Sequence, residues 1–291
     1  MQTAVQAAAP EVTRSAGTLR TRALSPALGA EIIGVDLSRP MSDELFATIL
    51  QCWHDNVVVL FRDQHLSEAD QVRFAERFGP LALSHTKRYT TANPAVMLIS
   101  NIRENGKQIG ALPDGDMQFH SDQCYQEKPA MASMLYAIEV PSVGGNTLFA
   151  NAYTAYETLN DDIKHRLNGR KALHAYDYDN ASMKRGTVIK EGVPHFAHPL
   201  VRTHPATGRK ALYVNRLMTI AIEGLPETES AELLSFLFEH QENPAFVYEH
   251  VWRVDDLLMW DNRCALHARS DFSNDERRLM RRVTVLGERP I

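Results

Sequence analysis

The chain contains 291 residues, of which 44% are hydrophobic and 23% are charged, and it carries a formal net charge of −5. This composition is typical of a globular protein and excludes a disordered one. The acidic balance offers no concentrated positive surface for phosphates, and no stretch reaches the ~20 consecutive apolar residues of a membrane span. We therefore expect neither a nucleic-acid partner nor a membrane partner.

The N-terminus and the cysteines indicate the compartment. Residues 1–20 are small and polar and lack a cationic lead before a long apolar run, so we predict a disordered tail rather than a secretion signal. Cys52, Cys124 and Cys264 lie far apart and form no CxxC pair, which excludes a disulfide scaffold and a cysteine-rich zinc site. These features predict a cytoplasmic protein.

In chain order, the hydrophobic pattern predicts many short strands with scattered helices. Ser42 and Ser67 are expected N-cap residues of two helices, and residues 57–61 form an apolar run typical of a strand buried on both faces. Further strands are predicted at 30–37, 96–99, 133–138, 200–202, 211–214, 246–252, 257–260 and 279–286, and further helices at 153–167 and 228–239. No linker divides residues 21–291, so we predict one domain. Its fold class is mainly β with flanking helices, a β-sandwich or jelly roll, and we favour the jelly roll (double-stranded β-helix).

The sharpest local motif is His120-Ser121-Asp122. In an extended strand, side chains two residues apart face the same side, so His120 and Asp122 can present an imidazole and a carboxylate to one point. Two histidines and one carboxylate on one face are the recurring ligand set of Fe(II) sites with open positions. Alone, however, the triplet is weak evidence, because it is more often a hydrogen-bonded surface pair than a metal site.

A third ligand and two arginines follow near the C-terminus. His267 lies beyond a buried strand and a polar turn, and Arg278 and Arg282 come later at spacings that put both on one face of the last strand. Two arginines on one face are costly to bury without anions, because a guanidinium does not neutralise itself. Either both face water, or the fold holds anionic ligands beside them.

Taken together, these motifs resemble the TauD/TfdA family of Fe(II)- and 2-oxoglutarate-dependent dioxygenases. The likeness extends from roughly Ala30 to Pro290. The segments that carry it, in order, are His120-Ser121-Asp122, Gly144-Gly145-Asn146-Thr147, Val201 to Arg209, Trp260-Asp261-Asn262-Arg263, His267 and Arg278.

The resemblance implies a role for each of these positions. His120, Asp122 and His267 would be the iron ligands, and Thr147 and Arg278 would bind the distal carboxylate of 2-oxoglutarate. Its α-keto carboxylate and dioxygen would take the open metal positions, and the reaction would release succinate and carbon dioxide. A guanidinium suits the carboxylate because it donates two parallel hydrogen bonds. Asp261 and Asn262 are expected to make turn hydrogen bonds that aim His267.

The substrate is predicted only by class. Arg282 resembles the residue that meets the substrate's anionic group, which implies a small organic anion such as a sulfonate, sulfate or carboxylate. Asp116 stands where taurine-oxidising members have an asparagine, Tyr125 keeps an aromatic residue, and Met218 replaces a phenylalanine. An acidic Asp116 does not suit a small sulfonate, so a larger, aryloxyalkanoate-like acid is equally compatible with these residues.

Several further expectations follow. Residues 101–116 and 176–194 are predicted lid loops, with trypsin cleavage near Lys184 and Arg185 slowed by ligands. The resemblance implies a homo-oligomer, a dimer or tetramer. Two other functions remain open at this point, namely a non-catalytic jelly-roll protein that binds a small acid and a zinc hydrolase, because histidine and carboxylate also bind zinc.

Overall fold

The computed structural model describes residues 19–84, 89–178 and 189–291. Its largest feature is a seven-stranded sheet in which only β2 and β3 run parallel. In sheet order its strands are β1 (Arg20–Ala23), β2 (Ala30–Ile33), β3 (Val58–Phe61), β16 (Leu257–Asp261), β8 (Ala130–Glu139), β18 (Leu279–Leu286) and β4 (Val96–Ser100). The edge strand β1 begins at Arg20, which is the last residue of the predicted tail, and residues 1–18 of that tail lie outside the described residues.

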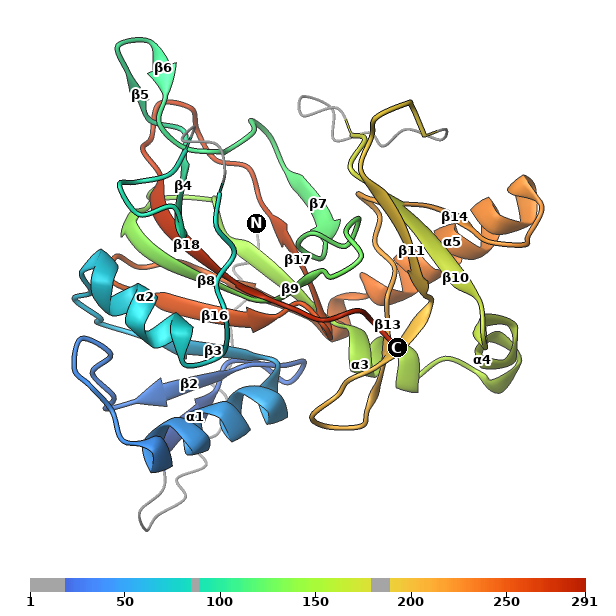
Figure 1. Cartoon of the computed structure of the whole chain (residues 1–291), viewed down its shortest axis with the longest axis horizontal. Coiled ribbons are helices and arrows are strands. Elements are labelled where there is room, and N and C mark those ends of the chain that lie inside the picture. Colours follow the sequence, from blue (N-terminus) through green and yellow to red (C-terminus); the bar gives the residue numbers. More distant parts are fainter. Residues whose placement is uncertain (1–18, 85–88, 179–188) are drawn as a thin grey trace, which may run out of the picture.

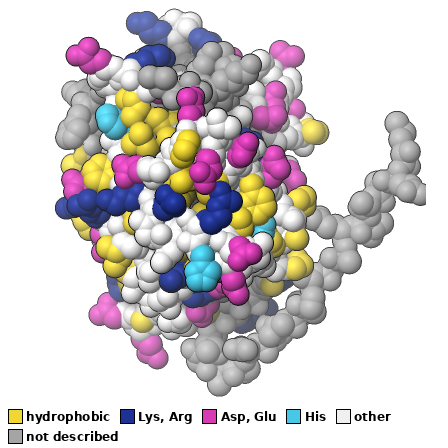
Figure 2. Space-filling model, turned by 90° about the vertical axis from the view of Figure 1, so that its right-hand side faces the viewer, with side chains coloured by type: hydrophobic (Ala, Val, Ile, Leu, Met, Phe, Trp, Pro, Cys, Tyr) yellow, Lys and Arg dark blue, Asp and Glu magenta, His cyan; other side chains and the backbone are white. Residues whose placement is uncertain are grey.

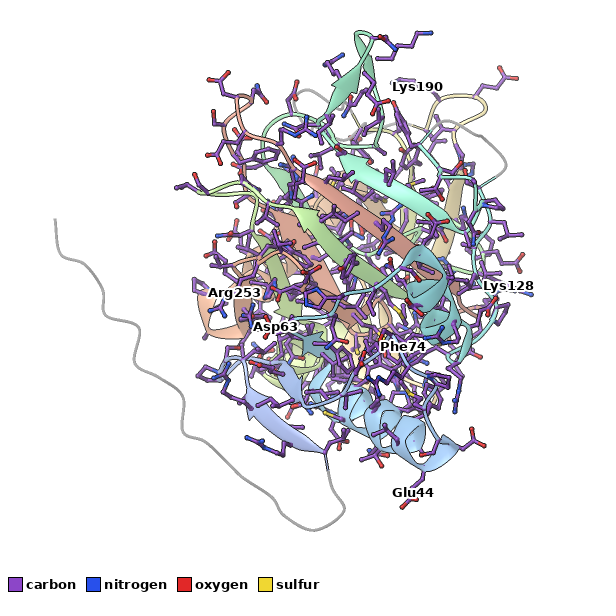
Figure 3. All side chains as sticks on the ribbon, turned by 90° about the vertical axis from the view of Figure 1, so that its left-hand side faces the viewer. Glu44, Asp63, Phe74, Lys128, Lys190 and Arg253 are labelled. Atoms are coloured by element: carbon purple, nitrogen blue, oxygen red, sulfur yellow. The ribbon has the colours of Figure 1, made fainter. Side chains whose placement is uncertain are left out.

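Two helices cover one face of this sheet, α1 (Asp43–Asn56) and α2 (Glu68–Glu76) (Figure 1). Both begin where the sequence predicts, because the side chains of Ser42 and Ser67 accept hydrogen bonds from the first turn of each helix. Phe74 of α2 is buried against the sheet, whereas Glu44 of α1 points away from the body of the protein (Figure 3).

A second, antiparallel sheet of four strands faces the other side. In sheet order it contains β15 (Val247–His250), β9 (Thr147–Asn151), β17 (Ala265–Arg269) and β7 (Met117–His120). A hydrophobic cluster joins the two sheets, with Leu135 and Trp260 from the larger sheet and Phe149 from the smaller one. The protein is therefore β-rich with flanking helices, as predicted.

The remaining elements form a third region, on the right in Figure 1. It comprises the sheet β11 (His195–Pro199), β10 (Lys171–Ala175) and β14 (Thr219–Ile222), the pair β12 (Val201–Thr203) and β13 (Lys210–Leu212), and helices α3 (Ala152–Glu157), α4 (Asp161–Leu167) and α5 (Glu227–Gln241). These pack around their own cluster, which includes Leu212, Leu234 and Leu237. The short strands β5 (Arg103–Glu104) and β6 (Lys107–Gln108) form a separate hairpin, and η1 (Pro244–Phe246) precedes β15.

The structure corrects several of the predicted elements. The single helix expected at 153–167 is two helices, because the Asn160 side chain accepts the Ile163 N–H at 2.8 Å and so starts a new helix. The strand that carries His267, β17, was not predicted, because its buried sequence Ala-Leu-His-Ala-Arg shows no alternation of apolar and polar residues.

The predicted cleavage site at Lys184 and Arg185 lies outside the described residues.

The surface agrees with the mixed charge of the sequence. On the face shown in Figure 2, basic and acidic side chains are interspersed with apolar ones among the described residues. In the described ranges, none of the helices combines the length and the apolarity that crossing a membrane requires.

Candidate active site

The register of two neighbouring strands brings the predicted metal ligands together. His267 in the middle of β17 is paired directly with His120 at the end of β7, and the centroids of the two imidazole rings are 4.1 Å apart. Asp122 lies in the turn after β7, so its approach depends on this turn rather than on the strand alternation assumed from the sequence. One ligand atom from each of the three side chains lies within 4.8 Å of the other two, and all three residues are buried.

The electrostatics of this triad suit a divalent cation. Burial lowers the pKa of His120, and burial together with His120 lowers the pKa of His267 to about 3, so both imidazoles are neutral. Burial alone would raise the pKa of Asp122, but Arg282, His267 and His120 outweigh it and hold the pKa of this carboxyl well below its usual value. Metal ligands must be deprotonated, and this triad supplies two neutral nitrogens and one carboxylate.

The histidine tautomer also agrees with this role. His120 donates its Nδ1–H to the Gln118 carbonyl at 2.9 Å, which leaves Nε2 with a free lone pair. Nε2 of His267 lies 3.9 Å from Oδ2 of Asp122. Each histidine therefore has a nitrogen close to the carboxylate, as the grouping of the three side chains requires.

Arg282, the residue predicted to meet the substrate, lies beside the triad. One of its guanidinium nitrogens, Nη1, is 3.4 Å from Oδ1 of Asp122, and the other, Nη2, is 3.2 Å from the sulfur of Met97. Its buried Nε has no partner within the described part of the chain. Arg282 thus combines a contact to one predicted metal ligand with unused hydrogen-bonding capacity.

A second cationic region is formed by Arg278, the residue that precedes β18, and the nearby Arg269. Arg278 is 1% exposed, and its Nε and Nη1 have no hydrogen-bond partner among the described residues. Burial and the nearby charge of Arg269 lower the pKa of Arg278 to about 9. A buried, unpaired guanidinium is unfavourable unless an anion binds to it, so these atoms fit a carboxylate ligand.

Arg269 is a site residue that the sequence reasoning missed. It lies two residues after His267 on the same face of β17 and is paired with Thr147 of β9. It is buried, its Nη2 donates to the Pro113 carbonyl at 2.8 Å, and its Nε has no partner among the described residues. The signal was the spacing His-Ala-Arg, which is visible only once β17 is known to be a strand.

Thr147 is delivered to this region by a glycine turn. Gly144 has φ +78°, and a Cβ placed on it would lie 2.3 Å from the Asp271 carbonyl oxygen, so the close approach requires glycine. A Cβ on Gly145 would lie 3.4 Å from Cδ of Arg278, which places the turn against that side chain. Thr147 is buried, and its Oγ1 accepts the Trp252 indole N–H at 3.0 Å, which leaves the hydroxyl proton free to donate.

The other predicted substrate residues are less closely grouped. Asp116 is exposed, and its Oδ1 accepts the Asp271 backbone N–H at 2.6 Å. Tyr125 packs against Tyr176, with ring centroids 4.8 Å apart, and burial raises its pKa to about 12. Met218 is buried and contacts the equally buried Cys124, with 3.5 Å between the sulfurs. The roles of Asp116, Tyr125 and Met218 in substrate binding stay predictions.

Comparisons with known proteins identify the family of this chain. A family model described as "Taurine catabolism dioxygenase TauD, TfdA family" matches residues 20–284. Pentalenolactone F synthase of Streptomyces avermitilis is 36% identical, over 93% of this chain and 94% of its own. The alpha-ketoglutarate-dependent 2,4-dichlorophenoxyacetate dioxygenase of Cupriavidus pinatubonensis is 35% identical, over 91% of this chain and 96% of its own.

Solved structures give the same result. A taurine dioxygenase from Burkholderia xenovorans superimposes with a TM-score of 0.81 at 30% identity, covering 94% of this chain and 91% of that one. The structure of AAD-2 in complex with Mn(II) and N-oxalylglycine also has a TM-score of 0.81 at 30% identity, covering 94% of this chain and 98% of that one. The protein therefore belongs to the TauD/TfdA family and is an α-ketoglutarate (2-oxoglutarate)-dependent dioxygenase.

Proposed function

We propose that His120, Asp122 and His267 hold one Fe(II) ion, with 2-oxoglutarate and dioxygen as co-substrates, inside a jelly-roll (double-stranded β-helix) core. The two neutral imidazoles and the ionised carboxylate support a divalent metal, and a related protein, AAD-2, was solved with Mn(II). The two facing sheets joined by a shared hydrophobic cluster support the jelly roll. When bound, the iron supplies the oxidation chemistry, while the protein positions the reactants and excludes water.

The observation that carries the proposal is the unpaired guanidinium of Arg278. Its Nε and Nη1 lack partners among the described residues, and the hydroxyl of Thr147 retains a free proton in the same region. We assign both to the distal carboxylate of 2-oxoglutarate, with Arg269 contributing a second positive charge nearby. A dicarboxylate whose tail neutralises this pair offsets the cost of burying it.

The substrate of the proposed reaction is an organic anion. Arg282 supplies the cation next to the triad, and relatives of this chain are named for phenoxypropionate, 2,4-dichlorophenoxyacetate and alkyl sulfate chemistry. The aromatic side chains of Tyr125 and Tyr176 favour a substrate with an apolar or aromatic body. One oxygen atom of dioxygen would enter a C–H bond of the substrate, and the other would enter the succinate formed as 2-oxoglutarate loses carbon dioxide.

Family membership favours this function over the two alternatives left open by the sequence. A non-catalytic acid-binding protein has no use for a triad of deprotonated ligands, and a zinc hydrolase has no use for a dicarboxylate anchor.

A succinate-release screen tests the proposal. The purified protein would be supplied with Fe(II), ascorbate, 2-oxoglutarate and one candidate each from aryloxyalkanoates, aliphatic carboxylates, sulfonates and alkyl sulfates. We expect succinate formation coupled to hydroxylation for at least one anion and none for its uncharged amide or alcohol counterpart. Arg282→Gln should lose this preference for the anion while retaining Fe(II) binding. Equal turnover of charged and uncharged compounds would contradict the assignment of Arg282.

A further inference from the structure

The turn between β16 and β17 contacts the predicted metal ligand Asp122 rather than His267. The sequence suggested that Asp261 and Asn262 aim His267, but the hydrogen bonds of Asn262 lead to Asp122 and to Ser133 of β8. Both Ser133 and Asn262 are buried, and neither is among the residues expected to touch metal, co-substrate or substrate.

Three hydrogen bonds join these side chains into a closed ring. The backbone N–H of Asp122 donates to Oδ1 of Asn262 at 3.2 Å, Nδ2 of Asn262 donates to Oγ of Ser133 at 3.1 Å, and Oγ of Ser133 donates to Oδ2 of Asp122 at 2.6 Å. Asp122 is therefore held at its backbone and at its carboxylate by the same ring.

The direction of each bond in the ring is determined by its neighbours. Oδ1 of Asn262 also accepts the Trp260 indole N–H at 3.0 Å, so two donors fix the orientation of the amide. Ser133 then receives the amide N–H, and its own proton is left for Asp122. A carboxylate that accepts this bond in a fixed direction is restrained from rotating about its Cβ–Cγ bond.

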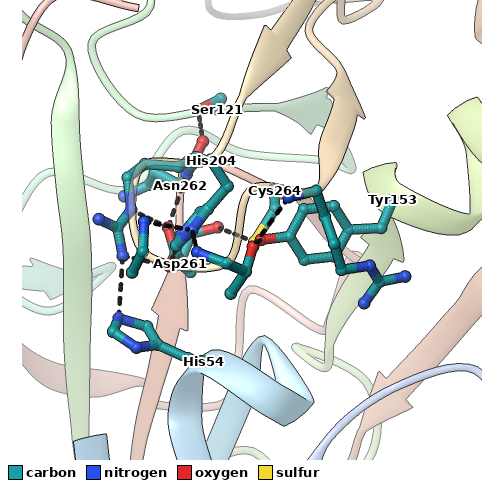
Figure 4. Close-up of polar contacts among 11 residues, drawn as sticks. His54, Ser121, Tyr153, His204, Asp261, Asn262 and Cys264 are labelled. Carbon is teal, nitrogen blue, oxygen red and sulfur yellow. Dashed lines mark hydrogen bonds and ion pairs between the residues drawn. The ribbon is translucent and has the colours of Figure 1, made fainter. Parts of the chain in front are cut away.

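Asp261 anchors the turn from its other side (Figure 4). Its carboxylate accepts from Arg263 at 2.8 and 2.7 Å and contacts Nε2 of His204 at 3.0 Å. Nδ1 of His204 accepts two backbone N–H groups, from Ala206 and Thr207. His204, Asp261 and Cys264 also lie close enough to bind a metal. However, the lone pair on Nδ1 of His204 accepts backbone N–H groups, its Nε2–H donates to Asp261, and a buried guanidinium neutralises Asp261, so this cluster is a structural support.

We propose that Ser133 and Asn262 are positioning residues that orient the Asp122 carboxylate and thereby set the affinity of the site for its divalent metal. This inference rests on the proposed function, because it assigns Asp122 as a metal ligand. Residues that hydrogen-bond to a metal ligand typically contribute about 10- to 100-fold in metal affinity. The hydroxyl of Ser133 is the member of the ring that can be removed with the smallest change in volume.

The test is Mn(II) binding to the metal-free full-length protein, measured by calorimetry without turnover. Ser133→Ala should raise the Kd for Mn(II) about 10- to 100-fold. Ser133→Thr keeps the hydroxyl, so its Kd for Mn(II) should remain within about threefold of wild type. If Ser133 only filled space in the core, the hydroxyl would not be expected to preserve the affinity in this way. The matched control is Ser230→Ala, because Ser230 is also buried and its hydroxyl accepts a backbone N–H from Ile222 at 2.8 Å, far from the triad.

The outcomes separate this inference from the proposed function. If His120→Ala binds Mn(II) as tightly as wild type, the metal site itself is wrong. If His120→Ala loses Mn(II) while Ser133→Ala keeps the wild-type Kd, the site stands and the positioning role is overturned. Equal losses in Ser133→Ala and Ser230→Ala, or in Ser133→Ala and Ser133→Thr, would also overturn it. The thermal unfolding midpoint of each metal-free variant shows whether the variant is folded.

Discussion

The two ends of the site are held in different ways. At the metal end, each Asp122 carboxylate oxygen and the Nδ1–H of His120 already has a partner within the chain. At the other end, Nε and Nη1 of Arg278 are buried without a partner among the described residues, and Arg269 adds a second positive charge. The first end is pre-organised by its own hydrogen bonds, whereas the second is completed only by an anion.

This difference predicts opposite responses to ligand removal. The proposed metal ligands are joined by strand pairing and by the hydrogen bonds of Ser133 and Asn262, so we expect the triad to keep its geometry in the metal-free protein. Arg278 carries an uncompensated charge until a carboxylate binds, so 2-oxoglutarate should stabilise the folded state as well as serve as co-substrate.

The largest effect is expected at the metal end. His267→Ala removes one of the three proposed ligands and leaves the other two in place, so metal binding and succinate formation should fall by more than about 100-fold, beyond what the loss of a supporting residue produces. Mn(II) calorimetry and the succinate assay measure both. His195→Ala is the control, because His195 is exposed and lies on β11, outside the site. If His267→Ala bound Mn(II) as tightly as wild type, the triad would not be the metal site, and the contrast between a metal end and an anion end would be wrong.

The next effect is expected at the anion end. Arg278→Gln removes the buried charge, so the protein should lose its stabilisation by 2-oxoglutarate, which for wild type amounts to about 2.7 kcal/mol at 100 times Kd. Without co-substrate, the variant should be at least as stable as wild type, because an unpaired buried charge is gone. Mn(II) affinity should be unchanged. Thermal unfolding under anaerobic conditions, with and without 2-oxoglutarate, measures these quantities.

Arg277→Gln is the matched control for this experiment. Arg277 is the preceding residue, but its guanidinium is largely exposed and pairs with Glu139 at 2.7 Å. Its variant should retain the full stabilisation by 2-oxoglutarate. If Arg278→Gln were destabilised in the absence of co-substrate by as much as in its presence, Arg278 would already have an internal partner, and the contrast between the two ends would be wrong.

A third prediction tests whether burial alone keeps a histidine neutral in this protein. His174 is buried beside His198, no carboxylate in the described part of the chain is hydrogen-bonded to it, and burial lowers its pKa to about 3 from 6.5. Between these values the unfolded chain binds more protons than the folded one, so the free energy of unfolding falls as the pH is lowered from 6.5 toward 3. His174→Asn lacks this titration and keeps an amide near the position of Nδ1, which contacts Thr219.

Urea unfolding at several pH values measures the difference. Between pH 6.5 and pH 5, wild type should lose about 1.5 kcal/mol more stability than His174→Asn. Above pH 7, the two proteins should differ by a constant amount, because the imidazole is neutral in both states. Parallel curves throughout the acidic range would show that His174 titrates normally in the folded protein.

The residues of the proposed metal site could be singled out from the sequence because the information that points to them is local. His120 and Asp122 are two residues apart, and the order of motifs through His267 and Arg278 resembles a known family closely enough to assign roles. The N-caps at Ser42 and Ser67 were also predictable, since a serine directly before a helical apolar pattern typically accepts a backbone N–H of the first turn.

The supporting contacts were not predictable because they join distant segments. Ser133 and Asn262 are separated by 129 residues, and the side chain that each one contacts depends on the register of β8, β16 and β17. Arg269 was missed because β17 is buried throughout and shows no alternation. In each case the chemistry of the residue was ordinary, and only the pairing of strands gave it a partner.

The smallest effect is expected at Thr147. It separates the contribution of this hydroxyl to 2-oxoglutarate affinity from the contribution of the arginines. Thr147→Val keeps the shape and removes the hydroxyl, so 2-oxoglutarate affinity should fall about 3- to 10-fold, the value of one hydrogen bond, with Mn(II) affinity unchanged. Thr147→Ser should retain wild-type affinity. The variant also leaves the Trp252 indole N–H without its acceptor, which costs stability independently of the ligand.

The variant Trp252→Phe separates the effect on ligand affinity from the effect on stability, because it removes the indole N–H that donates to Thr147. If the hydroxyl donates to the co-substrate, Thr147→Val in the Trp252→Phe background still weakens 2-oxoglutarate binding but costs less stability. If the hydroxyl serves only Trp252, the effect of Thr147→Val on affinity disappears in that background. The anion end would then depend on its guanidinium groups alone. Its contrast with the metal end, where both Asp122 carboxylate oxygens and the His120 Nδ1–H have partners, would be sharper still.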